Sequence, residues 1–289
     1  MALRGGRPVV QACASEALPG HAVAASLTSS NVVDQAPVAA ALRAVLDRIG
    51  GRLKRVALII PDVAARVSVV RFERVPEKRD DLDQLVRWQV RKAAPFPIDE
   101  ACVTYTPGVT DPAGGAEFIV VLARQDVVKG YEDVCAQAGV HAGLVDIATF
   151  SVVNLALASA APQGDWLLVH MRPEYTSIGI VRDGNLIFFR NRPEGNAESL
   201  ADVVHETAMY YQDRLAGQGF SRVLVGGSAE AVEAARSSLE ERLGTRVEPL
   251  DPTWAAPVAD RISISPDLKD VLAPLAGILL RTRAAAVPA

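Results

Sequence analysis

The sequence predicts an α/β protein built from two similar halves, and three observations support this. Short apolar runs of strand length, such as those at 55–61 and 165–171, alternate with segments of helical periodicity. Each half contains strands, a long helix, a further strand and a closing helix. The first half also carries a β-α-β-β-α pattern at 67–140, which predicts a small α/β module inserted into a larger domain.

Composition fits a well-packed soluble protein. Hydrophobic residues make up 49% of the 289 residues and charged residues 22%, and the net charge is −4 with both signs interspersed. This balance does not favour nucleic-acid binding. No apolar run approaches the length of a membrane span, and the N-terminus lacks the apolar segment of a signal peptide. Three cysteines without metal-like spacing indicate a reducing cytosol.

The first half is predicted element by element. The run RVALIIP is continuously apolar, so we expect it to be a strand buried on both faces. Residues 144–159 are expected to be a strand end that continues into an apolar helix. Residues 107–115 are expected to be a hairpin turn. The other expected strands are 8–18, 65–76, 101–105 and 117–123, and the expected helices are 34–49, 81–93 and 125–138.

The second half repeats this plan with clearer turn signals. Asp183-Gly184 between two apolar runs is a strong hairpin signal. Glycine pairs and isolated glycines punctuate the remaining elements. The further expected strands are 165–171, 221–227 and 246–252, and the expected helices are 198–215, 228–244 and 268–281.

The most informative stretch is 81–105, DLDQLVRWQVRKAAPFPIDEACVTY. Apolar residues recur at helical spacing up to Ala93, with acids in the first turn and bases in the second half, as the helix dipole favours. Pro95 and Pro97 end the helix and hold Phe96 nearly extended. A strand follows from Ala101.

This stretch resembles the PilM family, the actin-like cytoplasmic proteins of type IV pilus assembly. Further matching pieces follow in the family's order: QDVVKGYEDVCAQAGV, VDIATFSVVNLAL, VRDGNLIFFR, AMYYQDRL, RVLVGG and LAPLAGILLR. The resemblance implies an actin-like fold of the cell-division-protein (FtsA) type. It implies a first-half core at 1–66 and 141–160, an inserted small subdomain at 67–140, and a second-half core at 161–289.

Three departures from the family pattern concern the nucleotide site. The first phosphate turn, which resembles D-I-G-S-S in the family, is not found. At the second turn, where D-x-G is expected, the chain has His170, Met171 and Arg172. Only NRPEGNA separates Arg190 from Glu198, so we expect the second-half small subdomain to be missing. These departures predict a degenerate nucleotide site.

The remaining candidate sites have two interpretations each. Gly226, Gly227 and Ser228 form a strand-to-helix turn, which either presents amides to an anion or is a tight connection capped by Ser228. The histidines lack metal spacing, and Asp80–Asp83 is typical of a helix start, so no metal site is predicted. Trp88 and Phe96 are either interface anchors or core residues of the module. The predicted partner-binding set is Arg87, Trp88, Arg91, Pro95, Phe96 and Pro97.

The resemblance implies a non-catalytic cytoplasmic scaffold, held at the inner membrane by its partner. That partner is the cytoplasmic tail of a PilN-like inner-membrane protein, gripped between the first-half core and the inserted subdomain. We expect no cofactor. One alternative is an actin-like ATPase that binds ATP. Another is a GspL-like cytoplasmic component of type II secretion, which is disfavoured because we expect no membrane helix after the final segment.

Overall fold

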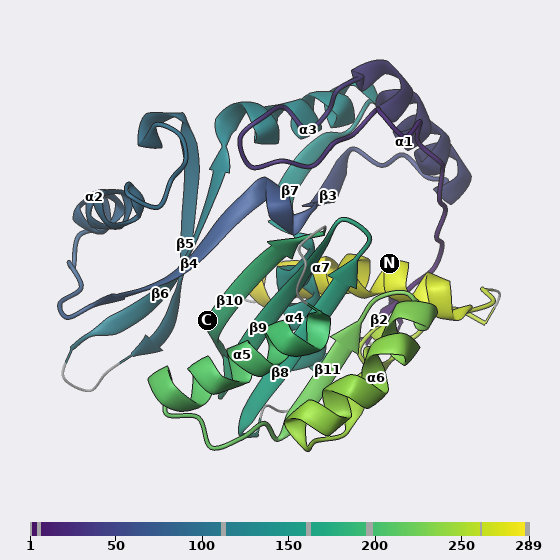
Figure 1. Ribbon diagram of the computed structural model, residues 1–289. Coiled ribbons are helices and arrows are strands. Elements are labelled where there is room, and N and C mark those ends of the chain that lie inside the picture. The colour runs from purple at the N-terminus through teal and green to yellow at the C-terminus, as the bar shows by residue number, and fades with distance from the viewer. Residues whose placement is uncertain are drawn as a thin grey trace. The chain divides into compact units, whose positions relative to one another are not determined.

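The computed structural model describes residues 2–4, 7–110, 114–159, 163–194, 199–260 and 262–286. The chain divides into two compact units, which are considered separately below (Figure 1). One unit comprises Met1–Gln11 and Thr149–Ala289, and the other comprises Ala12–Ala148.

The unit formed by Met1–Gln11 and Thr149–Ala289 is built on a five-stranded sheet of order β10-β9-β8-β11-β12. Its strands are β8 (Asp165–Arg172), β9 (Tyr175–Arg182), β10 (Asn185–Pro193), β11 (Arg222–Gly226) and β12 (Val247–Pro249). The first three form an antiparallel meander, and β11 and β12 continue the sheet in parallel. The β9–β10 hairpin turns at Asp183 and Gly184, whose φ angles are 48° and 81°. Both angles are left-handed, as the predicted turn requires.

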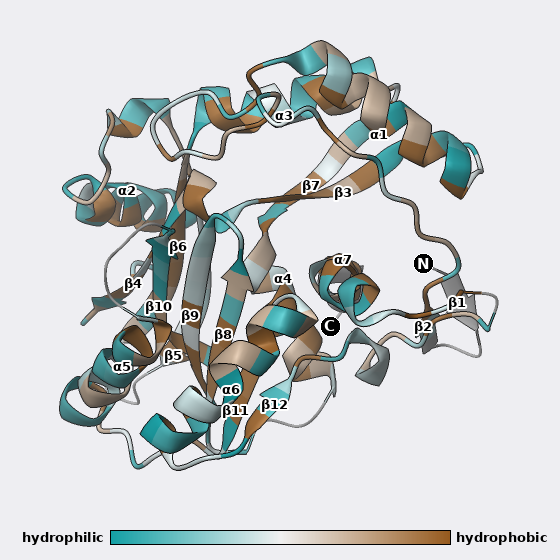
Figure 2. Ribbon diagram, turned by 45° about the vertical axis from the view of Figure 1, so that its right-hand side comes forward, coloured by the Kyte–Doolittle hydropathy of each residue, from teal (hydrophilic) through white to brown (hydrophobic). Residues whose placement is uncertain are grey.

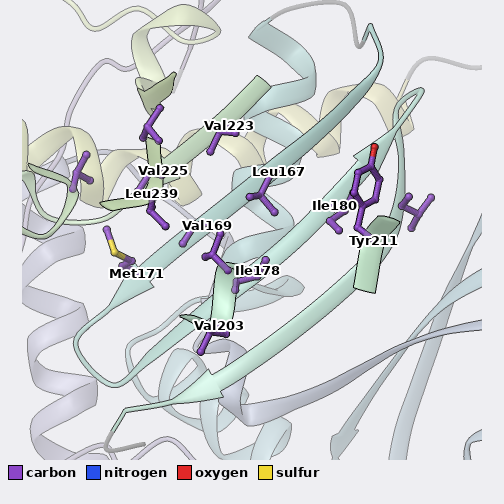
Figure 3. Close-up of a cluster of buried hydrophobic side chains, with 14 residues drawn as sticks. Leu167, Val169, Met171, Ile178, Ile180, Val203, Tyr211, Val223, Val225 and Leu239 are labelled. Atoms are coloured by element: carbon purple, nitrogen blue, oxygen red, sulfur yellow. The ribbon is translucent and has the colours of Figure 1, made fainter. Parts of the chain in front are cut away.

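Helices cover both faces of this sheet. Helices α5 (Leu200–Arg214) and α6 (Ala229–Leu243) lie on one face, and α4 (Ala148–Ser159) and α7 (Pro266–Ala286) lie on the other (Figure 1). A cluster of buried side chains joins the sheet to α5 and α6. It includes Leu167, Val169, Met171, Ile178, Ile180, Val203, Tyr211, Val223, Val225 and Leu239 (Figure 3).

Short elements complete this unit. They are the two-stranded pair β1 (Ala2–Arg4) and β2 (Arg7–Val9), and the 3₁₀ turn η3 (Pro252–Trp254). The expected strand at 8–18 is wrong in extent, because β2 ends at Val9 and only Val10 forms a further bridge, to Val258. Residues 11–18 form no strand.

In the unit formed by Ala12–Ala148, α1 (Gln35–Ile49) and α3 (Gln125–Gln137) pack on the parallel pair β3 (Arg55–Ile60) and β7 (His141–Ile147). Two small clusters of buried side chains lie under these helices, and Leu42 of α1 packs against both. Contrary to expectation, β3 is half-buried along most of its length rather than buried on both faces. A continuous apolar run requires burial only where neighbouring strands enclose it, and in the described part of this unit β3 pairs with β7 alone.

The rest of this unit is a three-stranded antiparallel sheet of order β4-β6-β5 with α2 on one face. Its elements are β4 (Ala65–Phe72), α2 (Arg79–Val90), β5 (Ala101–Thr110) and β6 (Ala116–Arg124), with the 3₁₀ turns η1 (Asp62–Ala64) and η2 (Ile98–Glu100). Part of the predicted hairpin turn, 111–113, lies outside the described residues, as does residue 198 of the predicted helix 198–215. We call the set β4, α2, β5 and β6 the module.

Figure 2 shows that the helices carry both hydrophobic and hydrophilic residues, as amphipathic elements do. The sequence pattern assigned residues 125–138 to the inserted module. In the structure, the apolar face of α3 packs against α1. Residues 149–159 belong to the unit of the five-stranded sheet. The three-part domain division stays a prediction.

Candidate partner-binding surface

The exposed face of α2 carries the most prominent candidate residue. Trp88 is 67% exposed, although tryptophan is usually well covered in folded proteins. Helical periodicity explains its position: Val86 and Val90 point into the module core and are buried. Arg87 and Arg91 are exposed beside Trp88. The interpretation of Trp88 as a core residue is therefore wrong.

The proline turn after α2 behaves differently. Phe96 is half-buried and packs against the module's hydrophobic cluster, whereas Pro95 and Pro97 are exposed. The Arg87 Nη1 group donates to the Ile98 carbonyl oxygen at 3.4 Å, a long hydrogen bond that joins helix and turn. The predicted set thus divides into an outward group on α2 and a turn fixed to the core by Phe96.

A hydrogen bond also fastens α2 to the sheet beneath it. The Tyr105 hydroxyl donates to the Asp83 carboxylate, and this bond raises the pKa of Tyr105. The Tyr105 ring stands edge-on to Phe118, with centroids 5.7 Å apart. These contacts hold α2 in place, so Trp88 projects from a fixed helix.

Sequence reasoning missed the second face of the module sheet. Val67 pairs with Val121 and Val69 with Ile119 across β4 and β6, and all four side chains are half-buried. They alternate with residues of the cluster under α2, so they lie on the face opposite that helix. The alternation in ARVSVVRF was the available signal, although the charged residues in this stretch are also typical of an exposed strand.

The candidate nucleotide turn after β11 is packed by protein atoms. Gly227 has φ 150°, and a Cβ placed there would lie 3.2 Å from both Cβ and the carbonyl oxygen of Met171. Ser228 caps α6 by accepting a hydrogen bond from the Ala231 amide at 3.2 Å. This geometry fits a tight strand–helix connection, the plainer of its two interpretations.

His170, Met171 and Arg172, which stand where the second phosphate turn was expected, all lie within β8. His170 is 1% exposed, and its Nδ1 forms a 2.8 Å hydrogen bond with Thr149 Oγ1. Burial, assisted by the nearby charge of Arg172, lowers its pKa to about 3. Its Nε2 has no hydrogen-bond partner among the described residues. His170 is therefore a neutral core residue.

Arg172 is fixed by an ion pair. Its Nη1 donates to Asp270 Oδ2 of α7 at 2.8 Å. Burial raises the pKa of Asp270, and the guanidinium of Arg172 opposes that shift. Because α7 supplies the counter-charge, Arg172 links β8 to a neighbouring helix.

The other sites considered from sequence are dispersed. His21, His141 and His205 are exposed in different segments. Asp80 and Asp81 lie in the first turn of α2, as a helix start favours. Within the described residues, no group of acidic, cysteine or histidine side chains could hold a metal ion. No described helix combines the length and apolar character needed to cross a membrane.

Comparison with known proteins identifies the family. The family described as type IV pilus assembly protein PilM matches residues 2–213. A solved PilM–PilN type IV pilus biogenesis complex is similar in structure, with a TM-score of 0.78 at 18% identity; the match covers 95% of this chain and 91% of that one. No curated protein matches.

Two less similar structures have TM-scores below 0.5. A Bacteroides thetaiotaomicron protein of actin-like ATPase fold and unknown function gives 0.47 at 10% identity, covering 87% of this chain and 84% of that one. The cytoplasmic domain of EpsL, an inner-membrane component of the Vibrio cholerae type II secretion system, gives 0.44 at 8% identity, covering 91% and 84%.

The predicted fold class is confirmed: the protein has an actin-like fold with a reduced second half, in which only residues 194–199 join β10 to α5. The family match spans most of the chain and agrees with the structural match over nearly its whole length. The chain belongs to the PilM family of type IV pilus assembly proteins.

Proposed function

We propose that this protein is a non-catalytic cytoplasmic scaffold that binds the cytoplasmic tail of a PilN-like inner-membrane protein. The proposal places it at the inner membrane through that partner. The observation that carries it is the exposure of Trp88, at 67%, on a helix fixed to the module. The similarity to a PilM–PilN complex supports the choice of partner.

The chemistry of the α2 surface suits a protein partner. Tryptophan and arginine are the residue types most often responsible for binding energy at protein interfaces. Arg87 and Arg91 flank Trp88 on the same exposed side, so an apolar anchor and two cations are available together. Pro95 and Pro97 extend this surface along the turn.

The half-buried face formed by Val67, Val69, Ile119 and Val121 offers a second element of recognition. An extended peptide can combine main-chain hydrogen bonds at a sheet edge with apolar side chains placed alternately on one face. β4 and β5 are the edge strands of the module sheet. Both features suit a short tail that becomes ordered when it binds.

We further propose that the protein acts without ATP or another cofactor. Two observations support this: Met171 lies against Gly227 in the turn after β11, and Arg172, which stands where a glycine was expected, is held by Asp270.

The test is tail binding by the double variant Arg87→Ala/Trp88→Ala. We expect affinity for a purified PilN-like tail to fall by about tenfold or more, because truncated anchor residues cost over ~1 kcal/mol each. The melting temperature should change little, since both side chains are exposed. Calorimetric titration and thermal unfolding measure the two quantities.

The matched control is Gln89→Ala/Lys92→Ala, which removes two other exposed side chains from the same helix region. It should leave tail binding unchanged. The proposal is wrong if the Arg87/Trp88 variant binds the tail as the natural protein does, or if it loses affinity only because it unfolds.

A further inference from the structure

The outer edge of β10 lies in the unit of the five-stranded sheet. β10 is nine residues long, and among the described residues it pairs with β9 on one edge and with no strand on the other. An unpaired edge of this length presents a row of N–H and C=O groups, which natural proteins usually shorten, bend or cover. The bulge between Leu186 and Phe188 interrupts only one end. The class of ligand that satisfies such an edge is another extended strand.

Exposed side chains of interface type lie beside this edge on the α5 face. Met209 and Tyr210 of α5 are 45% and 46% exposed. The Tyr210 ring contacts Phe188 of β10, with centroids 5.4 Å apart, so helix and strand form one continuous surface. Aromatic residues, methionine and arginine are enriched where proteins bind one another.

Positive charge is added by Arg190, which shares this face. Its Nη1 lies 3.4 Å from Glu206 Oε2, and the two side chains are 40% and 54% exposed. Such an exposed pair contributes little and exchanges readily for another carboxylate.

From these three features we infer that the β10–α5 surface binds an extended acidic segment of another protein, which adds a strand to the sheet along β10. Its backbone pairs with the free edge, its apolar side chains contact Phe188, Met209 and Tyr210, and its carboxylates contact Arg190. This surface is separate from the α2 surface and does not depend on the proposed pilus partner.

Charge favours an acidic partner over a second copy of this chain. Two copies paired along β10 would bring Arg190 of both copies onto one face of the joined sheet. An acidic strand neutralises the same side chains and aligns the partner as it approaches.

The experiment uses fluorescence anisotropy with a labelled, end-capped decapeptide that alternates glutamate with valine and phenylalanine. Two companion probes are used. In one, lysine replaces glutamate; the other is the acidic peptide with N-methyl groups along its centre. The variant Arg190→Glu reverses the charge. Its matched control is Arg236→Glu on α6, whose arginine is 37% exposed and pairs with Glu233 at 3.3 Å.

We expect saturable binding of the acidic probe and no binding of the N-methylated probe, which cannot complete the strand pairing. Arg190→Glu should lower the affinity for the acidic probe by about tenfold and raise the affinity for the lysine probe, because the charge reversal repels glutamate and attracts lysine. Arg236→Glu should change neither. Hydrogen exchange should slow within β10 when the acidic probe is bound.

Three results would overturn the inference. Equal weakening by Arg190→Glu and Arg236→Glu would mean that the peptide responds only to overall charge. Retained binding of the N-methylated probe would exclude strand addition. A dimer in analytical ultracentrifugation that Arg190→Glu dissociates would mean that a second copy occupies the edge.

Discussion

His170 stands where the family pattern led us to expect the acid of a phosphate turn, and in this structure it is a buried core residue. It lies on the α4 side of β8 and is hydrogen-bonded to Thr149. With its pKa lowered from 6.5 to about 3, the folded protein binds fewer protons than the unfolded chain between those two values. Stability is therefore fully present above about pH 6.5 and is lost as the pH falls.

The resulting prediction concerns acid stability. Below pH 6.5 the free energy of unfolding should decrease by about 1.4 kcal/mol for each pH unit from this group alone. Between pH 6.5 and 4.5, His170→Gln should take up about one proton fewer on unfolding than the natural protein, whatever the effect of the substitution on stability at neutral pH. Urea unfolding followed by circular dichroism at several pH values measures this slope.

His205→Gln is the matched control, since His205 is exposed on α5. The natural protein and this control should have the same slope. Carboxylates such as Asp270 contribute equally to all three proteins, so they cancel in the comparison. If His170→Gln retains the full slope, the imidazole is not the group that resists protonation.

At the scale of elements, Gly277 of α7 lies directly against the backbone of α4. A Cβ at Gly277 would lie 1.7 Å from the Ser151 carbonyl oxygen and 3.3 Å from the Leu155 amide nitrogen. These are backbone atoms, which cannot rotate away as a flexible side chain can. Glycine at this position therefore allows α7 to pack directly on α4.

We expect Gly277→Ala to destabilise the protein by about 1–3 kcal/mol or more, because overpacking forces the two helices apart. Gly130→Ala in α3 is the comparison: its Cβ would meet Val32 at 4.0 Å, an ordinary contact. That substitution should be neutral or stabilising by up to about 1 kcal/mol, since alanine has the better helix propensity. Equal melting temperatures for the two variants would contradict this account.

Elements specified by local chemistry were predictable from sequence. The β9–β10 hairpin follows from Asp183-Gly184, and α1 ends at residue 49, as predicted, with Gly50 as its C-cap. The strand expected at 8–18 depended on a partner strand that local pattern cannot supply, so only its beginning formed. The burial of β3 likewise depends on which strands lie beside it.

The candidate site was predictable to a similar degree. Periodicity gave the helix that carries Trp88, and Pro95 and Pro97 indicated the turn that carries Phe96. It could not decide which aromatic pointed outward, because the direction of Phe96 depends on the path of the chain after Pro95. The apolar face with Val67 and Ile119 required knowledge of the β4–β6 register, which sequence alone does not provide.

At the scale of the whole molecule, the protein is a reduced version of an actin-like fold. The chain passes from β10 to α5 through residues 194–199, too few for the additional subdomain of the family pattern. Within the five-stranded unit, the strand end where a phosphate turn was expected is tied to its surroundings by Thr149 and Asp270, and Met171 lies against Gly227. Loss of nucleotide binding would therefore involve several elements at once.

This reasoning predicts that restoring the family residues does not restore the site. The double variant His170→Asp/Arg172→Gly supplies the acid and the glycine but breaks the ion pair to Asp270 and buries a carboxylate beside Thr149. We expect neither the natural protein nor this variant to bind ATP with micromolar affinity, which corresponds to about −8 kcal/mol. Calorimetric titration with and without Mg²⁺ measures this, on protein shown to be folded by circular dichroism.

Arg172→Gly alone is the control for folding, because it leaves His170 in the core while removing the cation. Any residual attraction of the natural protein for ATP should depend on Arg172, weaken with salt over a screening length of about 8–10 Å, and show no need for Mg²⁺. Magnesium-dependent binding that appears in the double variant would mean that only the turn has decayed and that the rest of the nucleotide site is intact. In that case the short β10–α5 connection would not be the reason for the loss, and the reduced second half would have to be regarded as compatible with ATP binding.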